Sequence, residues 1–144
     1  MPFIIALIGL FMCLSTPADA QDVFTDFENG AWGYPRDQEP SCRNNPHTIR
    51  FSQDRTHAEF AWFGPMTTYL RQQKSSAGYT VISHGSDRIV MAMDEETRLT
   101  PQGDLVVWVL ITLPNDMYCW GRTDWPSTGC LAIHVRCPEL PPIS

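Results

Sequence analysis

The feature that most constrains the fold is a succession of short segments in which apolar and polar residues alternate, each bounded by turn-forming residues. Such segments favour β-strands, because successive side chains of a strand point to opposite faces. No segment carries an apolar stripe of helical period that is long enough to indicate a helix. The pattern predicts eight strands, at residues 31–35, 47–52, 57–63, 78–84, 88–94, 104–112, 116–121 and 131–136.

Eight short strands in a chain of this length favour a single all-β domain, an antiparallel up-and-down β-barrel. The alternation is clearest in the second and third strands, where one face would carry Ile49, Phe51, Ala58, Phe60 and Trp62. The sixth segment, LVVWVLIT from Leu105, is apolar on both faces. We expect it to be the most buried strand, or one that meets a partner.

The connections between the predicted strands alternate in length. Those after the second, fourth and sixth strands are tight, whereas those after the first, third, fifth and seventh are long. In an up-and-down meander every second connection lies at the same end. We therefore expect a barrel with one closed end of tight turns and one open end of long loops.

The first twenty residues, MPFIIALIGLFMCLSTPADA, are typical of a signal peptide, because an apolar run precedes the small-x-small pattern Ala18-Asp19-Ala20. The run is too short to span a bilayer, and no later segment is long enough. We expect cleavage after Ala20, a single domain over 21–144, and a periplasmic or secreted protein. Lipoprotein processing at Cys13 is the poorer alternative, because Met12 is bulkier than the residue such cleavage prefers.

Removal of this segment moves the formal net charge from -6 to -5, because Asp19 is its only charged residue. A net negative charge argues against a nucleic-acid partner or an anionic membrane surface, since either would favour a basic patch.

Cleavage leaves four cysteines, Cys42, Cys119, Cys130 and Cys137, and an even number in an oxidising compartment favours two disulfides. Cys130 and Cys137 lie at opposite ends of one strand, roughly 23 Å apart at about 3.3 Å per residue, which is beyond disulfide reach. Cys119 and Cys130 flank one hairpin loop. By elimination we expect the bonds Cys119–Cys130 and Cys42–Cys137. The second bond requires either the 35–45 loop or the C-terminal tail to run along the barrel.

The sequence predicts no metal, cofactor or catalytic centre. It has no Cys-x-x-Cys pair, and its histidines at 47, 57, 84 and 134 are scattered. The adjacent Glu95 and Glu96 would point to opposite faces of a strand or be solvated in a loop. Ser83 and Ser86 lack the elbow and the acidic partner of a nucleophilic serine.

The stretch MYCWGRTDWPSTGC, residues 117–130, lies at the expected open end. In one interpretation Arg122 and Asp124 form an ion pair and the tryptophan rings cap the barrel. In the other, Trp120, Arg122 and Trp125 form a rim that binds a ligand, because rigid aromatic side chains and arginine dominate binding hot spots. Both interpretations stay open from the sequence.

Three short features resemble those of lipocalins and the wider calycin group. They are Asn29-Gly30-Ala31-Trp32 at the first strand, Asn115-Asp116-Met117-Tyr118 between the sixth and seventh, and Arg136 late in the last. The resemblance implies that Arg136 packs over the Trp32 ring at the closed end, with Gly30 also structural. A tryptophan at this position would plug the barrel and need one acceptor for its indole N–H.

The resemblance implies an exported binding module that holds a small apolar or amphipathic ligand at the open end. The alternative is an exported protein that inhibits a protease or another hydrolase. Such an inhibitor would use the open-end loops or the 21–27 segment, whose Phe24 and Phe27 look exposed in the sequence.

Overall fold

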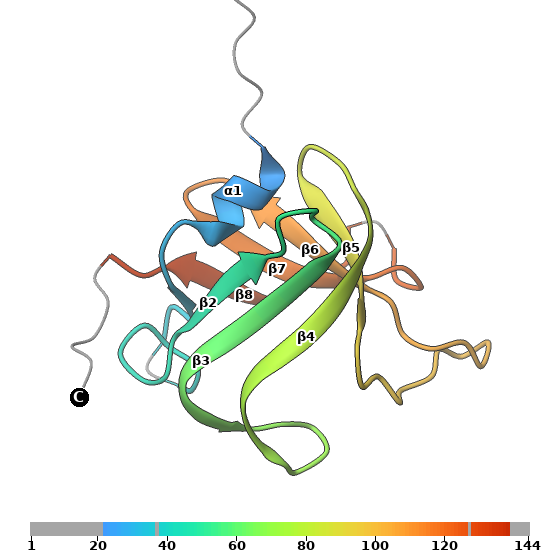
Figure 1. Cartoon of the computed structure of the whole chain (residues 1–144), viewed down its shortest axis with the longest axis horizontal. Coiled ribbons are helices and arrows are strands. Elements are labelled where there is room, and N and C mark those ends of the chain that lie inside the picture. Colours follow the sequence, from blue (N-terminus) through green and yellow to red (C-terminus); the bar gives the residue numbers. More distant parts are fainter. Residues whose placement is uncertain (1–21, 37, 127, 139–144) are drawn as a thin grey trace, which may run out of the picture.

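The computed structural model describes residues 22–36, 38–126 and 128–138, and they form a closed barrel of eight antiparallel strands (Figure 1). Each strand pairs with its neighbours in the chain, and β1 closes the barrel against β8. The predicted all-β up-and-down barrel is confirmed. The expected signal peptide and Cys13 lie outside the described residues. The strands are β1 (Trp32–Gly33), β2 (His47–Phe51), β3 (His57–Thr67), β4 (Gln73–His84), β5 (Arg88–Met93), β6 (Trp108–Leu113), β7 (Met117–Arg122) and β8 (Leu131–Arg136).

One short helix, α1 (Val23–Glu28), lies across the end of the barrel that carries the tight turns (Figure 1). Asp22 caps it, because its side chain accepts a hydrogen bond from the Phe24 N–H. Val23, Phe24 and Phe27 occupy one face and are buried in the core. The helix was not predicted, and the expectation of exposed aromatic residues in the 21–27 segment is wrong, because Phe24 and Phe27 are buried.

Trp32 completes this closed end, as predicted. It is 2% exposed, and its indole N–H donates to the Phe27 carbonyl at 2.9 Å. The Arg136 guanidinium lies 4.4 Å from the centre of the Trp32 ring, which confirms the expected cation–π contact. Such a contact contributes about 0.5 to 2 kcal/mol. Arg136 also donates to the Asp26 carbonyl and faces the Asp116 carboxylate, so it joins three segments at this end.

The open end differs from the prediction at β3 and β4. Both strands run beyond their predicted limits and meet in a tight turn at 68–72, so the long loop expected after the third strand is wrong. The pairing shifts register between Ala61 and Met66, and this irregularity accommodates Gly64 and Pro65, which usually interrupt strands. The resulting hairpin projects at the end opposite α1 (Figure 1).

Two other strands are each three residues shorter than predicted, β1 and β6. β1 has only two residues, because the chain turns into the 34–46 loop, where Tyr34 pairs with Ser41 outside the ladder. β6 begins at Trp108, not at 104. Leu105, the first residue of the segment expected to be most buried, is 56% exposed, although Val109 and Leu110 are buried.

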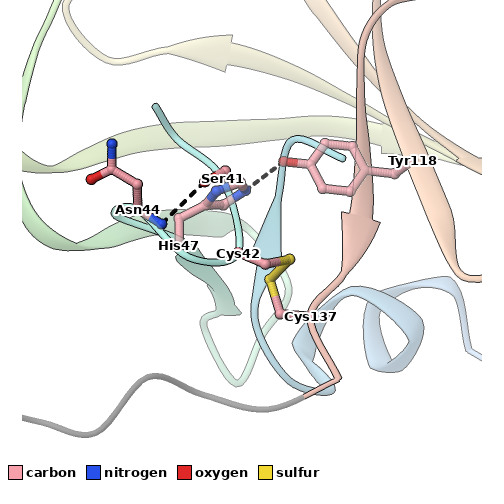
Figure 2. The surroundings of a disulfide bond; sticks show 6 residues. All are labelled: Ser41, Cys42, Asn44, His47, Tyr118 and Cys137. Carbon is pink, nitrogen blue, oxygen red and sulfur yellow. Dashed lines mark hydrogen bonds between the residues drawn. A yellow bond between two sulfur atoms is a disulfide. The ribbon is translucent and has the colours of Figure 1, made fainter. Parts of the chain in front are cut away.

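Both predicted disulfides are present, Cys42–Cys137 and Cys119–Cys130. Of the two routes considered for the first bond, it is the 34–46 loop that runs along the barrel, since Cys137 follows β8 directly at the closed end and its N–H donates to Ala31. Ser41 is buried in this loop and accepts from the Asn44 N–H (Figure 2). Gly33 fits beneath the loop because a Cβ there would collide with the backbone of Ser41 and Cys42.

Within the described part of the chain, no helix has the length and apolar character needed to cross a bilayer.

Candidate ligand-binding cavity

A cavity of about 860 Å³ occupies the barrel interior. It extends from Tyr118, which packs against Phe27 and Trp32 of the closed end, to Tyr69, Arg98 and Trp125 of the open-end loops. Its lining includes Tyr34, His47, Phe60, Trp62, Met66, Tyr79, Met93, Trp108, Tyr118, Trp120 and His134. The cavity therefore has a floor, aromatic walls and a mouth.

The floor is made by His47, Tyr118 and His134. The Tyr118 hydroxyl and His47 Nε2 lie 2.5 Å apart in a hydrogen bond (Figure 2). The His134 ring is stacked between Tyr34 and Tyr118, with ring centres 4.5 and 4.6 Å away, and it meets the His47 ring edge-on at 5.1 Å. His47 and His134 are each 3% exposed.

This floor is polar but uncharged near neutral pH. Burial, followed by the charge of nearby His134, lowers the pKa of His47 to about 3. Burial lowers the pKa of His134 to about 4, against the opposing effect of a hydrogen bond with the Ala132 backbone. Burial raises the pKa of Tyr118, so its phenol keeps its proton. Both imidazoles are therefore neutral at physiological pH.

Two polar atoms of the floor lack a protein partner. The Nδ1 atoms of His47 and His134 are buried and have no hydrogen-bond partner among the described residues. Buried polar atoms of folded proteins are nearly always paired, so such atoms call for a physical reason.

Four aromatic side chains form the walls above the floor. Phe60 contacts Tyr79 and Trp120 at centre distances of 5.0 and 5.1 Å, and Tyr79 stacks on Trp120 at 5.7 Å. Trp108 meets Trp120 edge-on at 6.0 Å. These rings come from β3, β4, β6 and β7, so the aromatic lining continues around much of the barrel.

The mouth contains an ordered polar cluster centred on Arg98. Its guanidinium lies 3.8 Å from the centre of the Tyr69 ring and 4.7 Å from that of Trp108. The Glu96 carboxylate accepts from Arg98 at 2.7 and 2.9 Å and from the Trp108 indole N–H at 2.7 Å. Burial alone would raise the pKa of Glu96, but these hydrogen bonds outweigh it and lower the pKa to about 2. Glu96 is thus a fixed anchor for Arg98, not a solvated loop residue as expected.

The three residues predicted to bind a ligand occupy different places. Trp120 lies deep in the wall and Trp125 at the mouth, and both line the cavity. Arg122 is not part of the lining; it is paired with Asp124 through two hydrogen bonds of 2.8 and 2.7 Å, as the capping interpretation predicts. Trp125 packs edge-on against Trp108, with ring centres 6.4 Å apart.

Sequence reasoning missed the floor and Arg98. His47 precedes Ile49 by two residues, so strand alternation places it on the same inward face, and this signal was present in the sequence. Arg98 gave no comparable signal, because it lies in the 94–107 loop between β5 and β6.

The described residues contain no group of three or more histidine, cysteine or acidic side chains arranged to hold a metal ion. No protein-family model matches the chain, and comparison with curated proteins and with solved structures gives no significant match. The closed antiparallel barrel of eight strands is consistent with a lipocalin-like fold.

Proposed function

We propose that the protein is a binding module that holds a small apolar or amphipathic ligand inside the barrel. The observation that carries this proposal is the cavity of about 860 Å³, which is closed at one end by α1 and Trp32 and reaches the loops at the other. Its volume lies within the range of about 300–1,000 Å³ that small-molecule sites occupy.

The chemistry of the lining supports the same proposal. Small-molecule sites are mostly apolar and aromatic, with few polar groups that fix the orientation of the ligand. Here Phe60, Tyr79 and Trp120 supply the aromatic walls, and His47 and His134 supply polar atoms at the floor. This combination suits a ligand with an apolar body and one polar end.

The proposal includes export from the cytoplasm. The two disulfides are consistent with an extracellular location, because such bonds persist in oxidising compartments. The signal-peptide pattern at Ala18-Asp19-Ala20 remains the sequence basis for this part.

Titration with N-phenyl-1-naphthylamine, a neutral dye that fluoresces in apolar sites, tests the proposal. We expect saturable binding at one site per chain, with quenching of tryptophan fluorescence because Trp108 and Trp120 line the cavity. Ala77→Phe adds a ring within the cavity and should weaken binding at least tenfold, whereas Ser83→Phe, on the exposed part of the same strand, should not. An absence of saturable binding, or an equal effect of both variants, would contradict a ligand site inside the barrel.

One observation favours the alternative, a protein that inhibits a hydrolase through its open-end loops. Leu99 and Leu105 pair across the 94–107 loop and are 60% and 56% exposed. Exposed apolar side chains at a loop tip suit a protein partner. In this case a hydrolase should copurify with the protein and be lost in the variant that carries Leu99→Asp and Leu105→Asp, while dye binding is unchanged.

A further inference from the structure

The floor of the cavity carries a hydrogen bond whose direction follows from the number of atoms left unpaired. If His47 Nε2–H donated to the Tyr118 oxygen, both the phenol proton and His47 Nδ1 would lack a partner among the described residues. If the phenol donates to His47 Nε2, 2.5 Å away, only Nδ1 is left unpaired, so this arrangement is favoured. A neutral imidazole carries one proton, so His47 holds that proton on Nδ1.

His47 Nδ1–H is consequently a donor that lacks an acceptor. His47 is 3% exposed and lines the cavity, and Nδ1 has no partner among the described residues. A buried donor that is left unpaired costs free energy, and an oxygen atom of a bound molecule recovers it. The floor therefore favours a ligand that brings a hydrogen-bond acceptor.

The charges around the cavity determine what kind of acceptor fits. The floor has no cation, because its polar groups are neutral imidazoles and phenols. At the mouth, Lys74 is paired with Glu95, and Arg98 with Glu96. A carboxylate or phosphate at the floor would be a buried charge without a counterion, which is strongly unfavourable.

We propose that the cavity binds flat, conjugated ring compounds through an uncharged oxygen, such as a ketone or amide carbonyl, which accepts a hydrogen bond from His47 Nδ1–H. The rings pack against the aromatic wall that Phe60, Tyr79 and Trp120 form together, where flat aromatic surfaces pack well. The inference rests on the proposed ligand-binding function and adds the chemical class of the ligand and the hydrogen bond that selects it.

Three pyrene compounds of similar shape test whether the cavity prefers an uncharged oxygen, no oxygen or a negative charge. In 1-acetylpyrene the side group carries a carbonyl oxygen, in 1-isopropenylpyrene a methylene group replaces that oxygen, and pyrene-1-carboxylate carries a charge. Each is titrated into the purified, oxidised protein, with energy transfer from tryptophan and pyrene anisotropy as the measurements. We expect 1-acetylpyrene to bind at least tenfold more tightly than each of the other two.

The outcomes distinguish this inference from the function on which it rests. If none of the three compounds binds, the proposed ligand-binding function itself fails. If the ketone and the alkene bind equally, the barrel binds apolar rings but His47 does not select the ligand. Tightest binding of the carboxylate would overturn the inference that the ligand is uncharged.

Variants assign the preference to His47. His47→Phe should abolish the preference for the ketone and leave the affinity for the alkene within twofold, whereas His57→Gln, an exposed histidine on the outside of β3, should change neither. If His47→Phe does not fold, Tyr118→Phe replaces it and should also abolish the preference for the ketone. Without the phenol proton, His47 is no longer held in the tautomer that donates from Nδ1. A ketone preference that survives in the folded variant would overturn the role of His47.

Nuclear magnetic resonance can measure which ring nitrogen of His47 carries the proton, a property that a merely structural role for His47 does not require. Long-range ¹⁵N–¹H correlation of the histidine rings should show His47 neutral at pH 7 with its proton on Nδ1. A proton on Nε2 would overturn the inference. Addition of 1-acetylpyrene should shift the Nδ1 and ring-proton signals of His47, while 1-isopropenylpyrene should leave the Nδ1–H without a hydrogen-bond shift.

Discussion

Lowering the pH from 7 to 5 should destabilise the barrel, because its two floor histidines are held neutral. In the unfolded chain each imidazole has the ordinary pKa of about 6.5. In the barrel, burial lowers the pKa of His47 to about 3 and that of His134 to about 4. Below pH 6.5 the unfolded chain binds more protons than the barrel, so the free energy of unfolding falls as the pH falls.

The size of this effect follows from the same pKa values. Between pH 7 and pH 5 each histidine lowers the free energy of unfolding by about 2 kcal/mol, or about 4 kcal/mol together. That is a large share of the roughly 5–15 kcal/mol by which domains are stable. The hydrogen bonds that lower the pKa of Glu96 to about 2 contribute stability above pH 4.5 and lose it only below, so they do not disturb this window.

Urea unfolding, followed by tryptophan fluorescence at pH 7, 6 and 5, measures the effect. His47→Gln and His134→Gln should each remove about half of the pH dependence, and the double variant nearly all of it. His57→Gln provides the control, because His57 is exposed and lies outside the floor. A wild-type free energy that changes by less than about 1 kcal/mol between pH 7 and 5 would refute the reasoning, since it would require charged imidazoles inside the barrel.

Trp32→Ala should lower the free energy of unfolding by about 3–5 kcal/mol, the usual loss for a large buried aromatic residue; a loss below about 1 kcal/mol in urea would show that the ring does not plug the barrel. Trp125→Ala should weaken binding of N-phenyl-1-naphthylamine about tenfold or more, because that ring lines the mouth. Arg122→Ala removes the ion pair with Asp124 and a contact over the Trp125 ring, so it should lower stability and weaken dye binding less than Trp125→Ala does; equal effects of the two variants on the dye would contradict their different positions. Replacing both Cys42 and Cys137 by Ala should cost about 4–5 kcal/mol, against about 3 kcal/mol for Cys119 and Cys130, because the closed loops differ in length. The reverse order in thermal unfolding would contradict this loop-closure argument.

The sequence predicts the bounds of three strands to within one residue. The bounds of β8 agree with the prediction, and those of β2 and β5 differ by one residue. The limits of β3 and β4 are wrong, since the predicted third strand stops before Gly64 and Pro65, whereas β3 continues past them with a shift in register. A register shift that absorbs such residues depends on contacts with the neighbouring strand, and local sequence does not contain them.

The helix α1 was missed for a different reason. Six residues are too few for a helical period to stand out against the background of alternating segments. The Asp22 cap and the burial of Phe24 and Phe27 become informative only once the barrel end that they cover is known.

The candidate site could be predicted only in part. The open-end loop predicts Trp120 and Trp125 as ligand-binding residues, and both line the cavity. The scattered positions of the histidines argue against a metal site, and they do not reveal that two of the rings meet. Their proximity arises because β2 and β8 both border the short β1, so His47 and His134 meet across the barrel, 87 positions apart in the numbering.

The brevity of β1 also has a consequence for association between molecules. β1 contributes one residue pair to β2 and two to β8, so little backbone pairing closes the barrel at this point. If Cys42–Cys137 were reduced and this junction opened, β2 and β8 would each present unpaired N–H and C=O groups, which other chains can extend by adding strands. Leu131 and Ile133 would add exposed apolar side chains along one of these edges. The Cys42–Cys137 disulfide would therefore limit polymerisation through these edges, in addition to stabilising the single molecule.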